Sequence, residues 1–453
     1  MISPARQRLA LAASVAGAAI VALDGGVLLV AQPVLQRDLG ASMAQVQWTS
    51  TGYLVAVAAL LVLAGRLGDR YGHRRLLAAG VLGFGAASAG MAATGSVGWV
   101  IALRVVQGAF GALLQPATLA LLRLAYPDDR LGRPIAVRTS ALAVAAGAGP
   151  VLGGLVVAQL GWRAVFWVNV PLAFAIALLT LTVRVPASAR PDEGGQSVGL
   201  AGSALLALTL AVFVHALAGI PGRGWTGTGT ALELLAAAGA LAVLIVYERR
   251  ARHPNLPRVV ARSVPVAASA AILLVTTAGL FGTLFRATFY LQDVLRLDPL
   301  ATGLRVLPLT ALMVLGAPVA GAALRRCGPR RTAVCGTLLV VMGITLLSRY
   351  GPGDARSAMA TAFAVLGAGF ATVMVTATAS VVGEAPPGYA GVVGGLKQTA
   401  MNVGPTLGIA VAAGTSGTAG VPGAAMSTTL VLLAGLAALG LVPASLLPRP
   451  ARA

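Results

Sequence analysis

Long apolar runs dominate this chain of 453 residues and constrain its fold more than any other feature. A helix needs about 20 apolar residues to cross a bilayer, and fourteen runs approach or exceed that length. Lipid offers the backbone no partners, and the runs lack the alternation of barrel strands, so each is predicted to be a helix. The predicted spans are 9–31, 46–65, 76–94, 97–122, 135–158, 164–183, 199–220, 231–247, 264–291, 303–324, 332–349, 357–382, 391–413 and 427–447. The predicted fold class is therefore an all-α membrane protein with fourteen transmembrane helices.

The distribution of charge orients these helices. The formal net charge is +20, with 33 basic residues against 13 acidic ones. Alternate loops and both tails hold 23 of the basic residues, whereas the opposite loops hold six. Basic residues concentrate on the cytoplasmic side, so both termini are predicted to be cytoplasmic. Orientation in a membrane thus accounts for the charge, and nucleic acid is not an expected partner. Lys397 is the only lysine, a bias that suggests a GC-rich bacterial genome and a bacterial inner membrane.

A charged segment between the second and third runs occurs twice. Gly65–Arg75 reads GRLGDRYGHRR, and Gly321–Arg331 reads GAALRRCGPRR, 256 positions later. Glycine, arginine, glycine and the terminal Arg-Arg recur at the same five offsets, but Arg325 replaces Asp69. This duplication predicts two related halves of six spans each, with two spans inserted between them. The expected divisions are an N-terminal bundle (1–184), a linker with two helices (185–262) and a C-terminal bundle (263–453).

The first copy offers one carboxylate and several guanidinium groups at the inner surface. A carboxylate there can accept hydrogen bonds from a helix N-terminus or a neighbouring arginine, so the segment is predicted to latch one state of a moving bundle. The alternative is an ordinary solvated, basic inner loop. The residues assigned to this latch are Gly65, Asp69, Arg70, Gly72, Arg74 and Arg75.

Two ionisable residues inside the first half are candidates for chemistry. Arg104 lies in the fourth span and shares one helix face with Gln107, Gly108 and Gly111. An arginine within a span usually faces a cavity, although Arg104 lies near enough to the outer end to snorkel outward. Asp24 lies at a similar depth in the first span, so the two are expected to meet and to couple transport to protons. The alternative is a static ion pair that fixes helix packing.

Further candidates lie in the fifth span and in the second half. A dense cluster of glycines around a proline predicts a kinked, closely packed helix at Gly147, Gly149, Pro150, Gly153 and Gly154. A substrate cavity between the halves is expected near mid-membrane, and the residues tentatively assigned to its lining are Tyr290, Gln292, Gln398 and Asn402. Three scattered histidines lack the spacing of metal ligands, and no nucleotide-binding loop of the Walker A type is present. No metal and no cofactor are therefore expected.

Together these motifs resemble the major facilitator superfamily, and the fourteen spans resemble its drug:proton antiporter branch of multidrug-efflux type. Gly65–Arg75 matches the inner-loop signature of that family, Arg104–Gly111 its fourth-helix motif, and Gly147–Gly154 the fifth-helix motif associated with exporters. The resemblance implies drug efflux in exchange for protons, with Asp24 and Arg104 in the coupling. The chain departs from the family pattern in the first span at Gly26, Leu29 and Gln32, and in the thirteenth at Met401 and Asn402.

The sequence therefore predicts a proton-coupled, monomeric exporter of lipophilic drugs or antibiotics, driven by the proton gradient. Two alternatives remain open. An importer or uniporter of a small metabolite would keep the same fold, and a sensor would bind a ligand without transporting it. A polytopic enzyme is disfavoured, because no clustered set of histidines or carboxylates has catalytic spacing.

Overall fold

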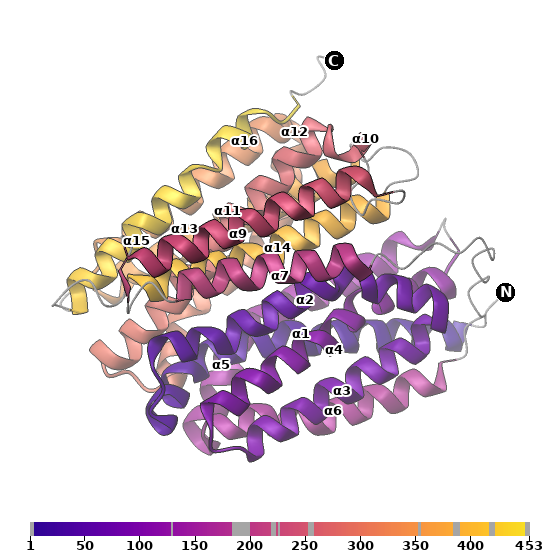
Figure 1. Cartoon of the computed structure of the whole chain (residues 1–453), viewed down its shortest axis with the longest axis horizontal. Helices are drawn as coiled ribbons and strands as arrows, with labels where there is room; N and C mark the ends of the chain where they lie inside the picture. The colour runs from indigo at the N-terminus through magenta and orange to yellow at the C-terminus, as the bar shows by residue number, and fades with distance from the viewer. Residues whose placement is uncertain are drawn as a thin grey trace. The chain divides into compact units, whose positions relative to one another are not determined.

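In a computed structural model of the chain every described element is helical (Figure 1). The structure describes residues 4–127, 130–183, 200–218, 223–224, 227–251, 258–351, 355–383, 390–415 and 422–448. Each of the fourteen predicted spans overlaps a described helix, which confirms the all-α membrane fold class. The last span is divided between two helices, α15 (Pro422–Ala438) and α16 (Leu441–Ser445).

Six helices precede the region of the inserted pair. They are α1 (Pro4–Leu39), α2 (Met43–Tyr71), α3 (His73–Ala93), α4 (Val97–Ala125), α5 (Gly132–Leu160) and α6 (Trp162–Thr182). Local sequence explains some of the boundaries. Ser42 and Gln45 form a reciprocal capping box at the start of α2.

The remaining helices are α7 (Leu200–Ala218), α9 (Thr228–Arg250), α10 (Arg258–Ala261), α11 (Val264–Phe289), the π-helical turn η2 (Tyr290–Val294), α12 (Pro299–Ser348), α13 (Arg356–Gly383) and α14 (Ala390–Gly414), followed by α15 and α16. Helix α12 has 50 residues, about 75 Å at 1.5 Å per residue, which is more than twice the hydrocarbon thickness. It contains the tenth and eleventh predicted spans, and Gly328 divides them with a positive φ of 77°.

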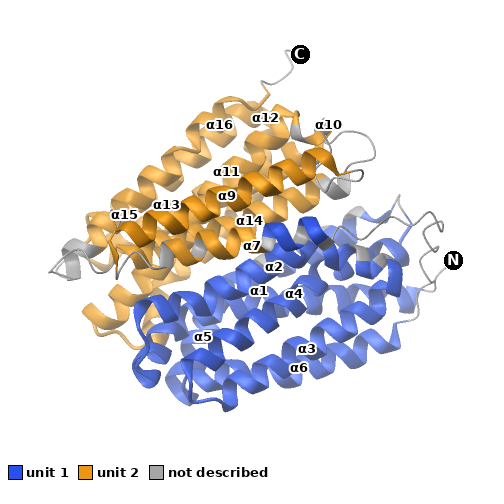
Figure 2. Cartoon of the chain, in the orientation of Figure 1, with its two compact units in different colours: residues 1–207 blue, residues 208–453 orange. Residues whose placement is uncertain are grey.

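The chain forms two compact units, Met1–Ala207 and Leu208–Ala453 (Figure 2). The division falls within α7, so the boundaries at 184 and 262 drawn from the sequence remain predictions. The helix pairs that pack together correspond between the units. Helix α1 packs on α5 as α11 packs on α14, α2 packs on α4 as the first part of α12 packs on α13, and α3 packs on α6 as α12 packs on α15.

Two apolar clusters form the core of the first unit. One includes Ile20, Val57 and Leu114, and the other includes Val27 and Phe166. Along α1, Asp24 lies between the residues that belong to the first cluster and those that belong to the second. The polar site described next is therefore enclosed by apolar packing on both sides.

Candidate functional site

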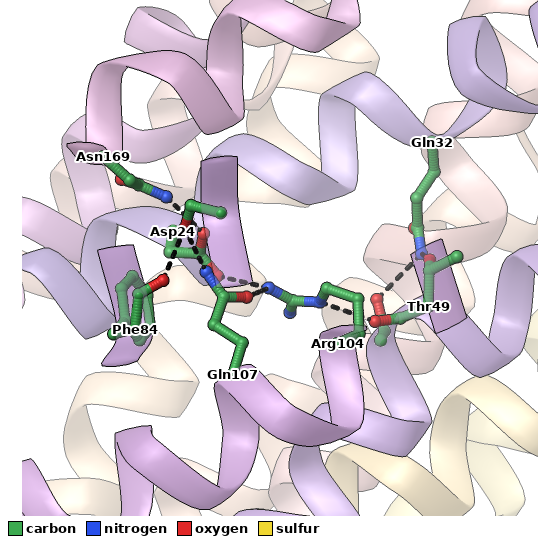
Figure 3. A network of polar contacts seen from close by, with 9 residues as sticks. Asp24, Gln32, Thr49, Phe84, Arg104, Gln107 and Asn169 are labelled. Atoms are coloured by element: carbon green, nitrogen blue, oxygen red, sulfur yellow. Dashed lines mark hydrogen bonds and ion pairs between the residues drawn. The ribbon is translucent and has the colours of Figure 1, made fainter. Parts of the chain in front are cut away.

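A buried ion pair lies at the centre of the first unit (Figure 3). Arg104 Nη1 donates to Asp24 Oδ2 over 2.6 Å. The second carboxylate oxygen of Asp24 accepts a hydrogen bond of 2.8 Å from Asn169 Nδ2 on α6. Asp24 is 2% exposed and Arg104 is 1% exposed. The predicted meeting of the two charges is thus confirmed, and the alternative in which Arg104 snorkels outward is wrong.

The rest of the Arg104 side chain is held from α2 and from its own helix. Its Nε donates to the Thr49 carbonyl oxygen over 2.8 Å, and its Nη1 also donates to Gln107 Oε1. The guanidinium carbon lies 4.4 Å from the centre of the Tyr53 ring, at cation–π distance. Contacts with Thr49, Gln107 and Tyr53 together orient the guanidinium toward Asp24. An arginine without such partners would be too costly to keep buried in a membrane.

Two glutamines extend the network to neighbouring helices. Gln107 Nε2 donates to Ser88 Oγ on α3 over 2.7 Å, and Ser88 in turn donates to the Phe84 carbonyl over 2.9 Å. Gln32 on α1 donates to Ser50 Oγ over 2.8 Å and to Thr49 Oγ1 over 3.1 Å. Gln32 departs from the family pattern, and here its amide ties α1 to α2. Five helices therefore share one polar network.

The glycines of the fourth-helix motif allow α2 to approach. A Cβ atom at Gly108 would lie 2.5 Å from the Tyr53 carbonyl oxygen, and one at Gly111 would lie 2.7 Å from the Tyr53 hydroxyl oxygen. Both distances are too short for a side chain. The motif thus places Tyr53 against α4, where its ring covers the Arg104 guanidinium.

The fifth-span motif brings α5 against α1 directly beside Asp24. A Cβ at Gly149 would lie 2.8 Å from the Gly26 Cα, and one at Gly153 would lie 2.7 Å from the Val27 Cα. The predicted close packing is confirmed, and Gly26, a departure from the family pattern, is the residue of α1 that permits it. The other motif residues, Gly147, Pro150 and Gly154, are buried in α5. Helix α5 continues through Pro150, and the kink stays a prediction.

The glycine motif of α5 has a second copy in α14 that the sequence analysis did not predict. Gly149-Pro-Val-Leu-Gly153 recurs as Gly404-Pro-Thr-Leu-Gly408, 255 positions later. In α14, a Cβ at Gly404 or Gly408 would collide with the backbone of α11 at Leu274 or Ala278. The spacing of 255, next to the spacing of 256 found for the charged segment, was the signal that could have revealed it.

The duplicated charged segment is not a loop. Residues 65–71 form the end of α2, residues 73–75 begin α3, and only Gly72 lies between them, with a φ of 93°. Gly328 occupies the same place in the second copy, also with positive φ. One glycine suffices for the turn because it adopts backbone angles that other residues avoid. The charged segment is therefore a tight turn between two helices, and the expected repeat is confirmed.

The side chains of this segment are only partly described. The Asp69 side chain lies outside the described residues, so its role as a latch stays a prediction. Arg74 Nη1 donates to the carbonyl oxygens of Leu181 and Val183 at the end of α6, over 3.4 and 3.1 Å. A cation at that end also suits the helix dipole. Arg70 and Arg75 are exposed and Gly65 is partly buried.

The tentative cavity residues all lie in the second unit. Tyr290 and Gln292 are each 2% exposed in η2, and Asn402 is 7% exposed in α14. Gln398 is partly buried one turn before Asn402. The π-helical turn places Tyr290 and Gln292 beyond the end of the regular helix α11. The four residues are the ones predicted to line the cavity. Their contact with a substrate stays a prediction.

Comparison with known proteins adds independent information. The family model of the Major Facilitator Superfamily matches residues 15–409 and 287–453. The tetracenomycin C resistance and export protein of Streptomyces glaucescens is 40% identical over 395 residues, which are 87% of this chain and 73% of that protein. A puromycin resistance protein of Streptomyces alboniger is 32% identical, over 86% of this chain and 78% of its own length. The multidrug efflux pump LfrA of Mycolicibacterium smegmatis is 31% identical, over 90% and 80%.

Solved structures with low sequence identity share the fold. A peptide transporter, solved in complex with sulfate, superposes with a TM-score of 0.69 at 14% identity, covering 96% of this chain and 93% of its own. The human organic anion transporter MFSD10 has a TM-score of 0.67 at 17% identity, covering 98% and 100%. At these identities the likeness concerns the arrangement of helices alone.

Proposed function

This chain belongs to the major facilitator superfamily, and we propose that it exports lipophilic drugs or antibiotics across a bacterial cytoplasmic membrane in exchange for protons. As a member of this family it is a multi-pass membrane transporter rather than an enzyme, and its transport needs no cofactor. Relatives named for resistance to, or export of, tetracenomycin C, puromycin and multiple drugs support drugs and antibiotics as the substrate class.

The buried pair of Asp24 and Arg104 is the observation that carries proton coupling. Protonation of Asp24 would leave Arg104 as a buried charge without its counter-ion, which destabilises this conformation by about 3–5 kcal/mol. A difference of that size is enough to shift a two-state equilibrium from one conformation to the other. Asp24 therefore takes up a proton in one conformation and releases it in the other, while Arg104, Gln107 and Asn169 rearrange around it.

Three further parts of the proposal rest on the sequence. Both termini are cytoplasmic because the basic loops alternate with less basic ones. The Asp69 carboxylate latches one conformation at the inner surface, and only the first copy can do so because Arg325 stands in the second. The protein works as a monomer, with Tyr290, Gln292, Gln398 and Asn402 facing the substrate.

A metabolite importer or uniporter is the main competing function on this fold, and a sensor that does not transport is the other. The glycine motif of α5 supports export, since it matches the fifth-helix motif of exporters in the resemblance described above. Direction of flux under an imposed proton gradient separates the exporter from the importer. A sensor would bind lipophilic ligands and move none of them.

The test uses inverted membrane vesicles and a panel of dyes and antibiotics. Wild-type protein should accumulate substrate when the vesicle interior is acidified. Asp24→Asn should abolish this uptake while the protein remains folded, and Arg104→Lys should reduce it sharply because a lysine cannot form the same planar set of hydrogen bonds. Asp38→Asn, which removes an exposed carboxylate from the same helix, is the matched control and should transport normally. Undiminished gradient-dependent uptake by Asp24→Asn would refute the role of Asp24.

A further inference from the structure

The mechanism above does not use Arg138, a partly buried arginine of the first unit. The sequence places Arg138 among the basic residues of the inner side, at the start of the fifth span. In the structure it lies six residues inside α5 and is partly buried. Its Nη2 donates to Thr118 Oγ1 on α4 over 2.8 Å. Arg138 thus points from α5 toward α4, within the helical bundle.

The surroundings of Arg138 differ from those of Arg104. Among the described residues, no carboxylate lies within 4.0 Å of Arg138. Its Nε is buried and has no hydrogen-bond partner among them. A guanidinium within a membrane helix is costly unless it is paired or faces a polar cavity. The structure around Arg138 therefore holds a cation whose counter-ion is not supplied by the described side chains.

Neighbouring hydroxyl groups fix the direction of this arginine. The Thr118 hydroxyl donates to the Gln115 carbonyl over 3.0 Å, so it can only accept from Arg138. Ser14 on α1 donates to the Thr118 carbonyl over 2.7 Å. Three helices, α1, α4 and α5, thereby hold Thr118 and Arg138 in place. A guanidinium has five N–H donors in a fixed plane. Among the described residues Arg138 makes one hydrogen bond, to Thr118, and its other donors can meet an acidic group.

Asp24 is not available to a cationic substrate in this conformation. Its two oxygens are occupied by Arg104 and Asn169, and the residue is buried. A positively charged molecule would have to displace Arg104 from Asp24. A negatively charged one would meet Arg138, which has no acidic partner among the described residues.

We propose that Arg138 binds an acidic group of the transported molecule, so that the exporter favours lipophilic acids over lipophilic cations. This inference rests on the proposed function, because it assigns the substrate class of that exporter. The chemistry is that of a carboxylate or phenolate accepting paired hydrogen bonds from a guanidinium. A lipid phosphate would offer the same chemistry, and the experiment distinguishes the two sources.

The experiment measures ligand binding by the full chain in nanodiscs of zwitterionic lipid. The probes are 11-(dansylamino)undecanoic acid and its primary amide, which differ in charge but little in size, with empty nanodiscs as background. Wild-type protein should bind the acid at least about tenfold more tightly than the amide, as expected for a charged hydrogen bond. Arg138→Gln should remove this preference, and Arg138→Lys should keep part of it. Arg133→Gln, which removes an exposed arginine from the same helix, should leave it unchanged.

Three outcomes would overturn the inference. Wild-type protein could show no preference for the acid, or Arg138→Gln could retain the preference in full. A preference that disappears when phosphatidylglycerol is added to the nanodiscs would assign Arg138 to lipid phosphate instead. Because binding is measured without a proton gradient, these results are independent of the vesicle assay. Failure of proton-driven uptake with intact acid binding would refute the exporter and leave the acid site standing.

Discussion

Helix α1 carries two carboxylates that each bind an arginine at nearly the same distance, yet in opposite surroundings. Asp24 lies 2.6 Å from Arg104, and both side chains are at most 2% exposed. Asp38 lies 2.7 Å from Arg163, and their side chains are 47% and 41% exposed. Asp38 also accepts from Trp162 Nε1 over 2.8 Å. Geometry alone therefore does not distinguish the two pairs, and burial does.

The difference shows why only one pair is suited to coupling. Water screens the exposed pair, so loss of the Asp38 charge changes the free energy of unfolding by less than about 1 kcal/mol. The buried pair has no such screening, and removal of one partner leaves an isolated charge in a medium of low dielectric constant. Protonation of Asp24 therefore changes the interactions that join several helices, whereas protonation of Asp38 changes only its own contacts with Arg163 and Trp162.

Removal of the buried carboxylate should have the largest effect. Asp24→Ala should lower the free energy of unfolding by about 3–5 kcal/mol, because Arg104 then stays buried without its counter-ion. Adding Arg104→Met should restore much of that loss. A double-mutant cycle measured by unfolding in detergent gives the coupling energy between the two residues. A coupling below about 1 kcal/mol would show that the buried pair behaves like the exposed one.

Close packing of α1 on α5 should come next, since it keeps water away from Asp24. Gly149→Ala places a methyl group 2.8 Å from the Gly26 Cα, and the overpacking should cost about 1–3 kcal/mol. Gly25→Ala is the matched control, because a Cβ there meets nothing within 4 Å. Equal thermal stability of the two variants would contradict the close approach of these helices.

The ring that covers the arginine should contribute less. Tyr53→Leu removes the cation–π contact with Arg104 and should cost about 1–2 kcal/mol. Tyr53→Phe keeps the ring and should have little effect, because the Tyr53 hydroxyl has no hydrogen-bond partner among the described residues. Thermal unfolding of both variants checks this, and a larger loss for Tyr53→Phe would mean that the hydroxyl carries the interaction.

The exposed pair should show the smallest effect. Asp38→Asn should lower the free energy of unfolding by less than about 1 kcal/mol, since water and salt already screen the charges. High salt should reduce even this difference, whereas it should leave the effect of Asp24→Ala nearly unchanged. Unfolding measured at low and high salt for both variants makes the contrast direct. An effect of Asp38→Asn above 2 kcal/mol would remove the distinction between the pairs.

Much of this site could be predicted, since depth in a membrane helix follows from residue counting. The sequence predicts that Asp24 and Arg104 meet because each lies about seven residues from the outer end of its predicted span, about 10 Å at 1.5 Å per residue. The count holds for Arg104 in α4, whereas α1 continues beyond its predicted span to Leu39.

The sequence predicted no role for Asn169, because its hydrogen bond to Asp24 depends on how α6 is rotated against α1. Thr49 contributes a backbone carbonyl, which no side-chain pattern reveals. The predicted spans end at 65 and resume at 76, whereas α2 and α3 continue through the charged residues as far as Gly72. Apolar length does not reveal this, because a helix can extend beyond its apolar run.

Hydrophobic length by itself determined the membrane class and the helical fold, because lipid leaves a backbone few alternatives to the helix. The duplicated charged segment predicted the two related halves. Tertiary structure alone decided which of the two ion pairs on α1 is buried, and that Arg138 has no acidic partner among the described residues. The reason is that burial and pairing belong to the contacts between helices. Those contacts depend on how each helix is rotated about its own axis. Small residues such as Gly26 and Gly149 allow α1 and α5 to approach closely, but they do not determine that rotation.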